Sequence, residues 1–264
     1  MVGLGLTASL LLSACGGSPN TGASKTAAGG GSSHPAAKAS KTTAGAHAPK
    51  APTTTTTAAA CATGTAASGI LLTVQQEPAK EIATPKGKCW ASIPYTPIAK
   101  LSTGTVPSGA KAQFKTAWTP KDLYILAYVQ KWPLYYANQG ATHDDDTVEF
   151  YLAGNDTFAT SYGPLDCQYN VVFNGTVSKT TTCNTGRAGT PVTRIVKGTG
   201  YYDELIVPWS MLKVANPAKG QEYAFSLAVD LASSTGKRLA QIEWAGGKNN
   251  DWSETKNWGN ITLG

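Results

Sequence analysis

The chain has 264 residues and a formal net charge of +6, from 22 lysines and arginines against 16 aspartates and glutamates. Four of the lysines (Lys25, Lys38, Lys41 and Lys50) precede the first acidic residue, Glu77, so the remaining sequence carries 18 basic against 16 acidic residues. Nucleic-acid binding requires a clustered basic surface. The near-neutral remainder, which has no lysine- or arginine-rich run, therefore excludes nucleic acid as the expected partner.

The first 15 residues resemble a bacterial lipoprotein signal. An apolar run, residues 6–12, leads into Leu12-Ser13-Ala14-Cys15, which resembles a lipobox whose cysteine carries diacylglycerol. The run is too short to span a bilayer as a mature helix. We therefore expect lipidation at Cys15 and an extracytoplasmic protein that is lipid-anchored to the bacterial cell membrane. An ordinary secretory signal with an incidental cysteine is the alternative, and the absence of a lysine or arginine before the apolar run departs from the usual signal.

Residues 16–60 consist mainly of alanine, threonine, glycine, serine, proline and lysine, and no aromatic residue occurs before Trp90. A segment with so little large apolar surface cannot offset the conformational entropy lost on folding. We expect a low-complexity flexible linker over residues 16–60 and one folded domain over residues 61–264.

Four cysteines remain in the expected domain, and an even number in an exported chain indicates disulfides. A hairpin with a three-residue loop at Asn174-Gly175-Thr176 would place Cys167 opposite Cys183. Cys61 would then pair with Cys89. Zinc is the weaker reading of these cysteines, because the sequence has no CxxC spacing and few histidines.

Short runs with alternating apolar and polar residues recur through the domain, and they predict an all-β fold, a β-sandwich of two antiparallel sheets. The candidate strands are Ala112–Trp118, Leu123–Gln130, Thr147–Leu152, Gln168–Phe173, Val192–Lys197, Tyr201–Val207, Tyr223–Leu231, Arg238–Trp244 and Ile261–Leu263. One helical turn is expected at residues 208–213, with Pro208 at its first position.

Four carboxylates gather in the sequence HDDDTVEFYLAG, residues 143–154. The alternation places Val148, Phe150 and Leu152 on one face of a strand and Glu149 on the other. Asp230 takes a similar place on a later strand. Trp252 lies in a polar loop without apolar neighbours, which predicts an exposed indole. Exposed aromatic rings beside acids and amides suit sugars, because ring faces stack on pyranose C–H groups while the polar side chains bind hydroxyls.

Five segments in order resemble carbohydrate-binding module family 9: WTPKDLYILAYVQ, DDDTVEFYL, DELIVPWSML, FSLAVD and IEWAGGKNNDWSETKNWGNITL. The resemblance covers about residues 90–263. It implies a non-catalytic β-sandwich that holds the terminal residue of a glycan between two tryptophans, with bound structural calcium being common and no cofactor required.

The resemblance also implies the site residues. The family's Asp-x-Val-Glu motif falls on residues 146–149, so Glu149 would hydrogen-bond the sugar, and its Asn-x-x-Trp motif supplies Asn249 and Trp252. The polar residue on the next strand falls at Asn170. His143 stands where the first stacking tryptophan is expected, and Trp132 is the candidate replacement. We expect Asp146 to order the loop before the strand, and Asp144 and Asp145 to form a solvated edge or a calcium contact.

Three other functions stay open. A glycosidase would need two facing carboxylates, and Glu149 with Asp230 or Glu204 is the candidate pair. A haem-binding electron-transfer protein would take its axial ligands from Met211 and His143. An adhesive or structural surface domain would need no small ligand.

Overall fold

The computed structural model describes residues 60–62, 71–78, 82, 86–137, 141–179 and 190–264, and this part of the chain is all-β. Within these described ranges, three single turns of 3₁₀ helix interrupt the strands. The elements are β1 (Leu71–Gln76), η2 (Lys88–Ala91), β2 (Thr96–Ile98), β3 (Lys100–Gly104), β4 (Lys111–Trp118), β5 (Asp122–Gln130), η3 (Thr142–Asp144), β6 (Thr147–Ala153), β7 (Asp166–Val172), β8 (Val177–Lys179), β9 (Thr190–Val196), β10 (Gly200–Pro208), η4 (Trp209–Leu212), β11 (Glu222–Ala232), β12 (Arg238–Glu243) and β13 (Gly259–Leu263).

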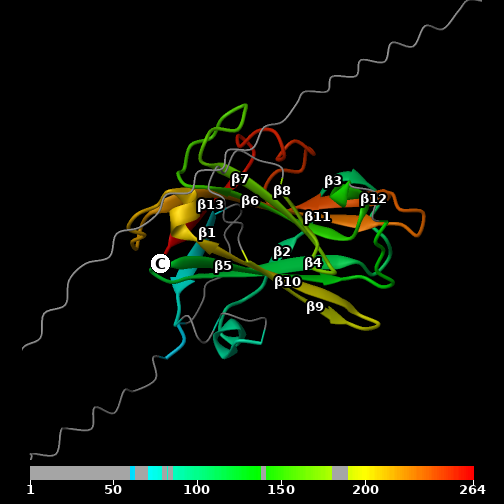
Figure 1. The fold of residues 1–264 in the computed structure, drawn as a ribbon, viewed down its shortest axis with the longest axis horizontal. Coiled ribbons are helices and arrows are strands. Elements are labelled where there is room, and N and C mark those ends of the chain that lie inside the picture. Colours follow the sequence, from blue (N-terminus) through cyan, green and yellow to red (C-terminus); the bar gives the residue numbers. More distant parts are fainter. Residues whose placement is uncertain (1–59, 63–70, 79–81, 83–85, 138–140, 180–189) are drawn as a thin grey trace, which may run out of the picture. The chain divides into compact units, whose positions relative to one another are not determined.

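The strands join in one hydrogen-bonded path, β8-β7-β6-β11-β13-β1-β4-β5-β10-β9, with β12, β3 and β2 attached at its sides. The path folds over itself, so that β6, β7, β8 and β11 lie in a layer facing β4, β5, β9 and β10 (Figure 1). β1 makes the connection, because residues 71–74 pair in parallel with β13 and residues 75–76 with β4. The all-β prediction is confirmed, but the two separate antiparallel sheets are not, since β1 links both layers through parallel pairings.

All nine predicted strands are present, and no end is shifted by more than two residues. The strands that the sequence analysis missed are β1, β2 and β3, which are short or pair with distant segments, whereas β8 is the second strand of the predicted hairpin. The predicted helical turn is η4, with Pro208 as its N-cap rather than its first residue.

The main core lies between the two layers and confirms the predicted inward faces. Val148, Phe150 and Leu152 of β6 are fully buried there, beside Phe225 and Leu227 of β11. Each such large apolar side chain contributes about 1.5–3 kcal/mol when it leaves water. The alternate residues of β6 and β7 are consequently fixed on the outer side of this layer, where Glu149 and Asn170 lie.

A second, smaller core covers the outer side of β4, β5 and β10. Ile82, Trp90 and Ile93 of the preceding segment pack against Tyr124 and Leu126 of β5. The predicted disulfide between Cys61 and Cys89 fastens this segment, with an S–S distance of 2.03 Å.

The hairpin between β7 and β8 differs from the predicted register. The structure pairs Asn170 with Ser178 and Val171 with Val177, so the loop consists of residues 173–175 and begins one residue earlier than expected. Gly175 has a φ of +87°. A three-residue loop needs its left-handed residue in last place, and glycine fills that place at least cost. Cys183 lies outside the described residues, so its bridge to Cys167 stays a prediction.

Residues 1–59 also lie outside the described part, so lipidation at Cys15 and the linker stay predictions. Among the described residues, no helix has the length and apolar character needed to cross a membrane.

Candidate functional site

A concavity of about 560 Å³ opens on the outer side of β6, β7 and β12 and collects most of the predicted site residues. It is lined by His143, Glu149, Gln168, Asn170, Arg238, Gln241, Asn249 and Trp252. Five of these eight are residues singled out from the sequence. They come from η3, β6, β7 and the loop after β12, so the fold brings together positions more than 100 residues apart.

Glu149 forms the floor of this concavity and is only 3 % exposed. Its Oε1 accepts a hydrogen bond from Asn170 Nδ2 at 3.3 Å, and its Oε2 accepts from Gln168 Nε2 at 3.4 Å and from the Tyr151 hydroxyl. Asn170 in turn donates to Thr142 Oγ1 at 3.0 Å. These contacts fix the carboxylate and the two amides in one orientation, which is the preorganisation that a specific polar site needs.

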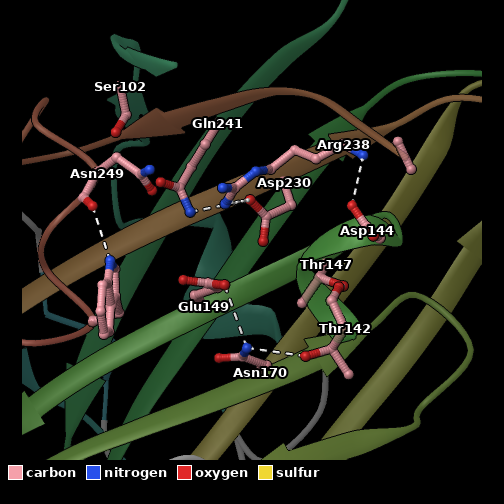
Figure 2. Close-up of polar contacts among 12 residues, drawn as sticks. Ser102, Thr142, Asp144, Thr147, Glu149, Asn170, Asp230, Arg238, Gln241 and Asn249 are labelled. Atoms are coloured by element: carbon pink, nitrogen blue, oxygen red, sulfur yellow. Dashed lines mark hydrogen bonds and ion pairs between the residues drawn. The ribbon is translucent and has the colours of Figure 1, made fainter. Parts of the chain in front are cut away.

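A second acid, Asp230, lies on β11, the strand next to that of Glu149. Asp230 Oδ1 accepts hydrogen bonds from Arg238 Nη1 at 3.1 Å and from Gln241 Nε2 at 3.0 Å, while its Oδ2 has no partner among the described residues. Figure 2 shows Glu149 between Asn170 on one side and Asp230 with Gln241 on the other. Burial, and then the neighbouring Glu149 carboxyl, raise the pKa of Asp230 well above its ordinary value, although Arg238 opposes this shift. Asp230 thus holds the Arg238 guanidinium beside the concavity.

Residues 245–258, which we call the Trp252 loop, form one wall. The indole of Trp252 is 58 % exposed, as predicted, and its Nε1 donates to the Asn249 carbonyl at 2.9 Å. The residue before it, Asp251, is buried and accepts a hydrogen bond from Ser226 Oγ at 2.8 Å. Its backbone carbonyl accepts from Tyr162 and from Trp258. The loop is therefore fixed from below while its indole faces solvent.

The three consecutive aspartates hold the loop before β6 to the rest of the domain. Asp146 is fully buried and accepts from Lys131 Nζ at 2.8 Å, Tyr135 N at 2.7 Å and Ala232 N at 2.9 Å, which agrees with its expected ordering role. Asp145 is buried as well and accepts from Ala137 N at 2.6 Å, so the predicted solvated edge is wrong for this residue.

Asp144 accepts from Lys237 Nζ at 3.0 Å and from Arg238 N at 3.1 Å. Calcium requires several free oxygen ligands around one point. The three aspartates instead face ammonium and amide donors, so they do not fit a calcium ion.

Comparison with known proteins identifies the family. The sequence model described as carbohydrate family 9 binding domain-like matches residues 84–264. The chain belongs to this family of carbohydrate-binding domains. The family resemblance drawn from the sequence motifs is thereby confirmed.

Two curated relatives of this family-9 domain are much longer enzymes. Endo-1,4-beta-xylanase A of Thermoanaerobacterium saccharolyticum is 30% identical over 158 residues, which are 59% of this chain and 13% of that protein. Exoglucanase XynX of Acetivibrio thermocellus is 30% identical over 157 residues, 59% of this chain and 14% of that protein. The chain thus spans only a small part of the length of these relatives.

Solved structures of the same family share the fold. A family 9 carbohydrate-binding module of Caldicellulosiruptor kristjanssonii in complex with cellotriose superposes with a TM-score of 0.63 at 25% identity, covering 73% of this chain and 93% of that one. Its complex with glucose gives a TM-score of 0.63 at 24% identity, covering 74% and 95%, which supports the fold.

Trp132 does not lie with the other predicted residues of the family-9 domain. It lines a different concavity, with Pro107, Tyr135 and Thr199 among its neighbours, because the segment after β5 lies beside the β3–β4 and β9–β10 turns. The hypothesis that Trp132 replaces the missing ring opposite Trp252 is therefore wrong.

Two residues proposed for the glycosidase and haem-binding alternatives, Glu204 and Met211, lie away from the concavity that Glu149 lines. Glu204 lies on β10, in the layer opposite β6, on the same side as Tyr202 and Ile206 of the second core. Burial raises its pKa to about 8. Met211 packs in the main core, whereas His143 is exposed beside the concavity. Neither Glu204 nor Met211 lines the concavity that contains Glu149 and His143.

Three lining residues were missed in the sequence: Gln168, Arg238 and Gln241. Gln168 was detectable, because it lies two residues before Asn170 and therefore on the same face of β7. Arg238 was harder to find, since an irregular register between Leu231 and Ala232 changes how the ends of β11 and β12 face each other.

Proposed function

We propose that this chain is a non-catalytic carbohydrate-binding module. It binds the terminal residue of a glycan in the concavity that Glu149 and Trp252 line, which we call the Trp252 concavity. One observation carries the proposal. An indole that is 58 % exposed and a fixed, buried carboxylate, Glu149, line the same concavity of sugar size. Aromatic faces and rigid carboxylate and amide groups are the two kinds of group that a pyranose needs.

In the proposed complex, the sugar ring lies on the Trp252 indole and its hydroxyls reach Glu149, Asn170 and Asn249. Gln168, Gln241 and Arg238 complete the polar floor. The known complexes of the family 9 module with cellotriose and glucose support a glucose-type ligand. His143 provides an imidazole edge instead of a second indole, so this site would stack on one side of the sugar and bind less tightly than a two-tryptophan clamp.

A non-catalytic role agrees with the burial of the acids. Asp230 is 0 % exposed and Glu149 already accepts hydrogen bonds from three side chains. A glycosidase needs one carboxyl group to protonate the leaving oxygen and a second to act on the opposite side of the bond. Asp230 does not line the concavity, whereas Arg238 and Gln241, which donate to its carboxyl group, do, so Asp230 is not placed to act on a bound glycosidic oxygen.

The proposed setting of the module is the outer side of a bacterial membrane. A diacylglycerol on Cys15 would anchor the chain, and residues 16–60 would act as a tether between the anchor and the domain. A layered β-sandwich at the end of such a tether would hold glycans at a distance from the lipid surface.

Isothermal titration of the purified chain with cellotriose, cellobiose, glucose and xylotriose tests the proposal. We expect a saturable heat signal with at least one of these sugars and its loss in Trp252→Ala. Phe158→Ala removes another exposed aromatic ring, which lines neither concavity, and should bind as the unaltered chain does. No heat signal with any of the four sugars would contradict terminal-sugar binding and favour the adhesive function.

A further inference from the structure

A second concavity, of about 420 Å³, surrounds the indole of Trp132. Its walls come from the turn between β3 and β4, the segment after β5 and the turn between β9 and β10, represented by Ser108, Pro133 and Thr199. The proposed binding of a terminal sugar beside Trp252 does not use any of these residues.

The indole of Trp132 is 47 % exposed, and the residue before it, Lys131, is buried. Lys131 points inward, where its Nζ donates to Asp146 Oδ2 at 2.8 Å and to the Pro133 carbonyl at 2.9 Å, and lies 4.6 Å from the centre of the Tyr135 ring. The Lys131 amide also donates to the Thr199 carbonyl at 3.0 Å, which joins two walls of the concavity. The exposed indole thus belongs to a fixed segment, and its exposure follows from the buried lysine beside it.

The polar groups around this indole are neutral hydrogen-bonding groups. The hydroxyls of Ser108 and Thr199 make no hydrogen bond within the part of the chain that the structure describes, and Gln130 makes a single contact of 3.4 Å through its Nε2. Among the described residues that line the concavity, Lys131 alone is charged, and Asp146 neutralises it. An exposed aromatic face with free hydroxyl and amide groups and no unpaired charge suits a neutral polyhydroxylated ligand.

The surroundings favour an extended ligand over a single sugar. Tyr135 also lines a neighbouring concavity of about 180 Å³, together with Tyr136, whose ring is exposed. Three aromatic residues therefore follow one another along adjoining hollows. All three concavities border the β11–β12 hairpin. Leu239 lines the concavity around Trp132, Gly236 lines the one beside Tyr136, and Arg238 lines the one beside Trp252.

We propose that the Trp132 concavity is a second carbohydrate-contact site, which takes internal units of a neutral polysaccharide chain. The inference takes its ligand class from the proposed function, but its residues are independent of that site. Two sites on one domain increase the apparent affinity for a polymer, because the second contact forms at a high effective concentration. Short sugars would gain nothing from the second site.

Indole N–H signals in NMR spectra of the ¹⁵N-labelled chain test this inference, with Trp132→Phe assigning the Trp132 signal. Cellohexaose and soluble xylan are the probes. We expect the Trp132 signal to shift with at least one of them, and to shift still in Trp252→Ala. Trp132→Ala should leave cellotriose affinity unchanged and lower the apparent affinity for the polymer about tenfold.

The outcomes separate the two proposals. A Trp252 signal that shifts while Trp132 stays unchanged with both probes would overturn the second site and leave the proposed function intact. A Trp132 response alone would support the second site and contradict the first. Equal polymer binding by Trp132→Ala and by the Phe158→Ala control would also overturn the second site. The exposed Trp132 ring would then be assigned to contact with another protein.

Discussion

Asp251 and Trp252 are adjacent in the chain and opposite in exposure, with values of 1 % and 58 %. The buried aspartate is the anchor of the exposed indole. Its carbonyl accepts from the Tyr162 hydroxyl at 2.5 Å and from Trp258 Nε1 at 3.2 Å, and its carboxylate accepts from Ser226. The orientation of the proposed stacking ring therefore depends on residues that no sugar would touch.

Tyr162→Phe is expected to weaken sugar binding without unfolding the domain. The change removes one hydrogen bond to the Asp251 carbonyl and keeps the ring contact with Trp258, whose centroid lies 5.5 Å away. A single hydrogen bond of this kind contributes about 1 kcal/mol, which corresponds to about a fivefold change in affinity. Titration with the best ligand of the unaltered chain measures the effect. An unchanged affinity would show that the loop keeps its shape without this contact.

Stability is expected to fall as the pH rises from about 4 to about 7. Burial, and then the neighbouring Glu243, raise the pKa of Asp251 from 3.8 to about 7. Between these values the folded chain keeps a proton that the unfolded chain has lost, so folding takes up a proton and is opposed by rising pH. Above pH 7 the contribution of Asp251 is constant. Thermal unfolding at several pH values measures this slope.

Asp251→Asn is expected to flatten that slope and to raise the melting temperature at pH 8. The amide keeps an acceptor for Ser226, and its N–H group replaces a buried oxygen that has no hydrogen-bond partner among the described residues and lies close to Glu243. Glu204→Gln is the matched variant in the other layer. It should remove a separate pH dependence of stability, which extends to about pH 8. An Asp251→Asn variant with the full slope would contradict the assignment.

Lys131→Met is expected to destabilise the domain by about 3–5 kcal/mol, because it leaves the fully buried Asp146 carboxylate without its cation. Chemical denaturation measures this loss. Lys121→Met, at an exposed lysine, should change the free energy of unfolding by less than about 0.5 kcal/mol. A similar small loss for both variants would mean that the three donors to Asp146 are redundant.

The double variant Cys61→Ala/Cys89→Ala is expected to lose about 3–4 kcal/mol of stability, since the bridge closes a loop across a sequence separation of 28. Because the disulfide lies under β4, β5 and β10, on the layer opposite Glu149, sugar affinity should stay unchanged while the domain is folded. A parallel loss of affinity at a temperature well below unfolding would contradict this separation of roles.

The sequence was sufficient for those parts of the fold that depend on local alternation. The nine predicted strands and the two faces of β6 follow from a period of two residues, because the apolar side chains of a strand must all point to the face that packs in the main core. β1 escaped detection because only Leu72 and Val74 are buried in its six residues and its partners are distant in sequence.

The site residues that belong to sequence motifs were predictable, whereas those whose position depends on strand register or long-range contacts were not. Glu149, Asn170, Asn249, Trp252 and His143 line one concavity, whereas Trp132 does not. The position of Trp132 depends on the direction of the chain after β5, and that direction is set by the long-range contact between Lys131 and Asp146. Such a contact leaves no periodic pattern in the sequence.

A crystal structure of the chain with cellotriose, or with the tightest sugar from the titrations, tests the central claim most directly. We predict a terminal pyranose lying flat on the Trp252 indole, with a hydroxyl within hydrogen-bonding distance of the Glu149 carboxylate. A sugar bound in any place where it touches neither Trp252 nor Glu149 would contradict the account.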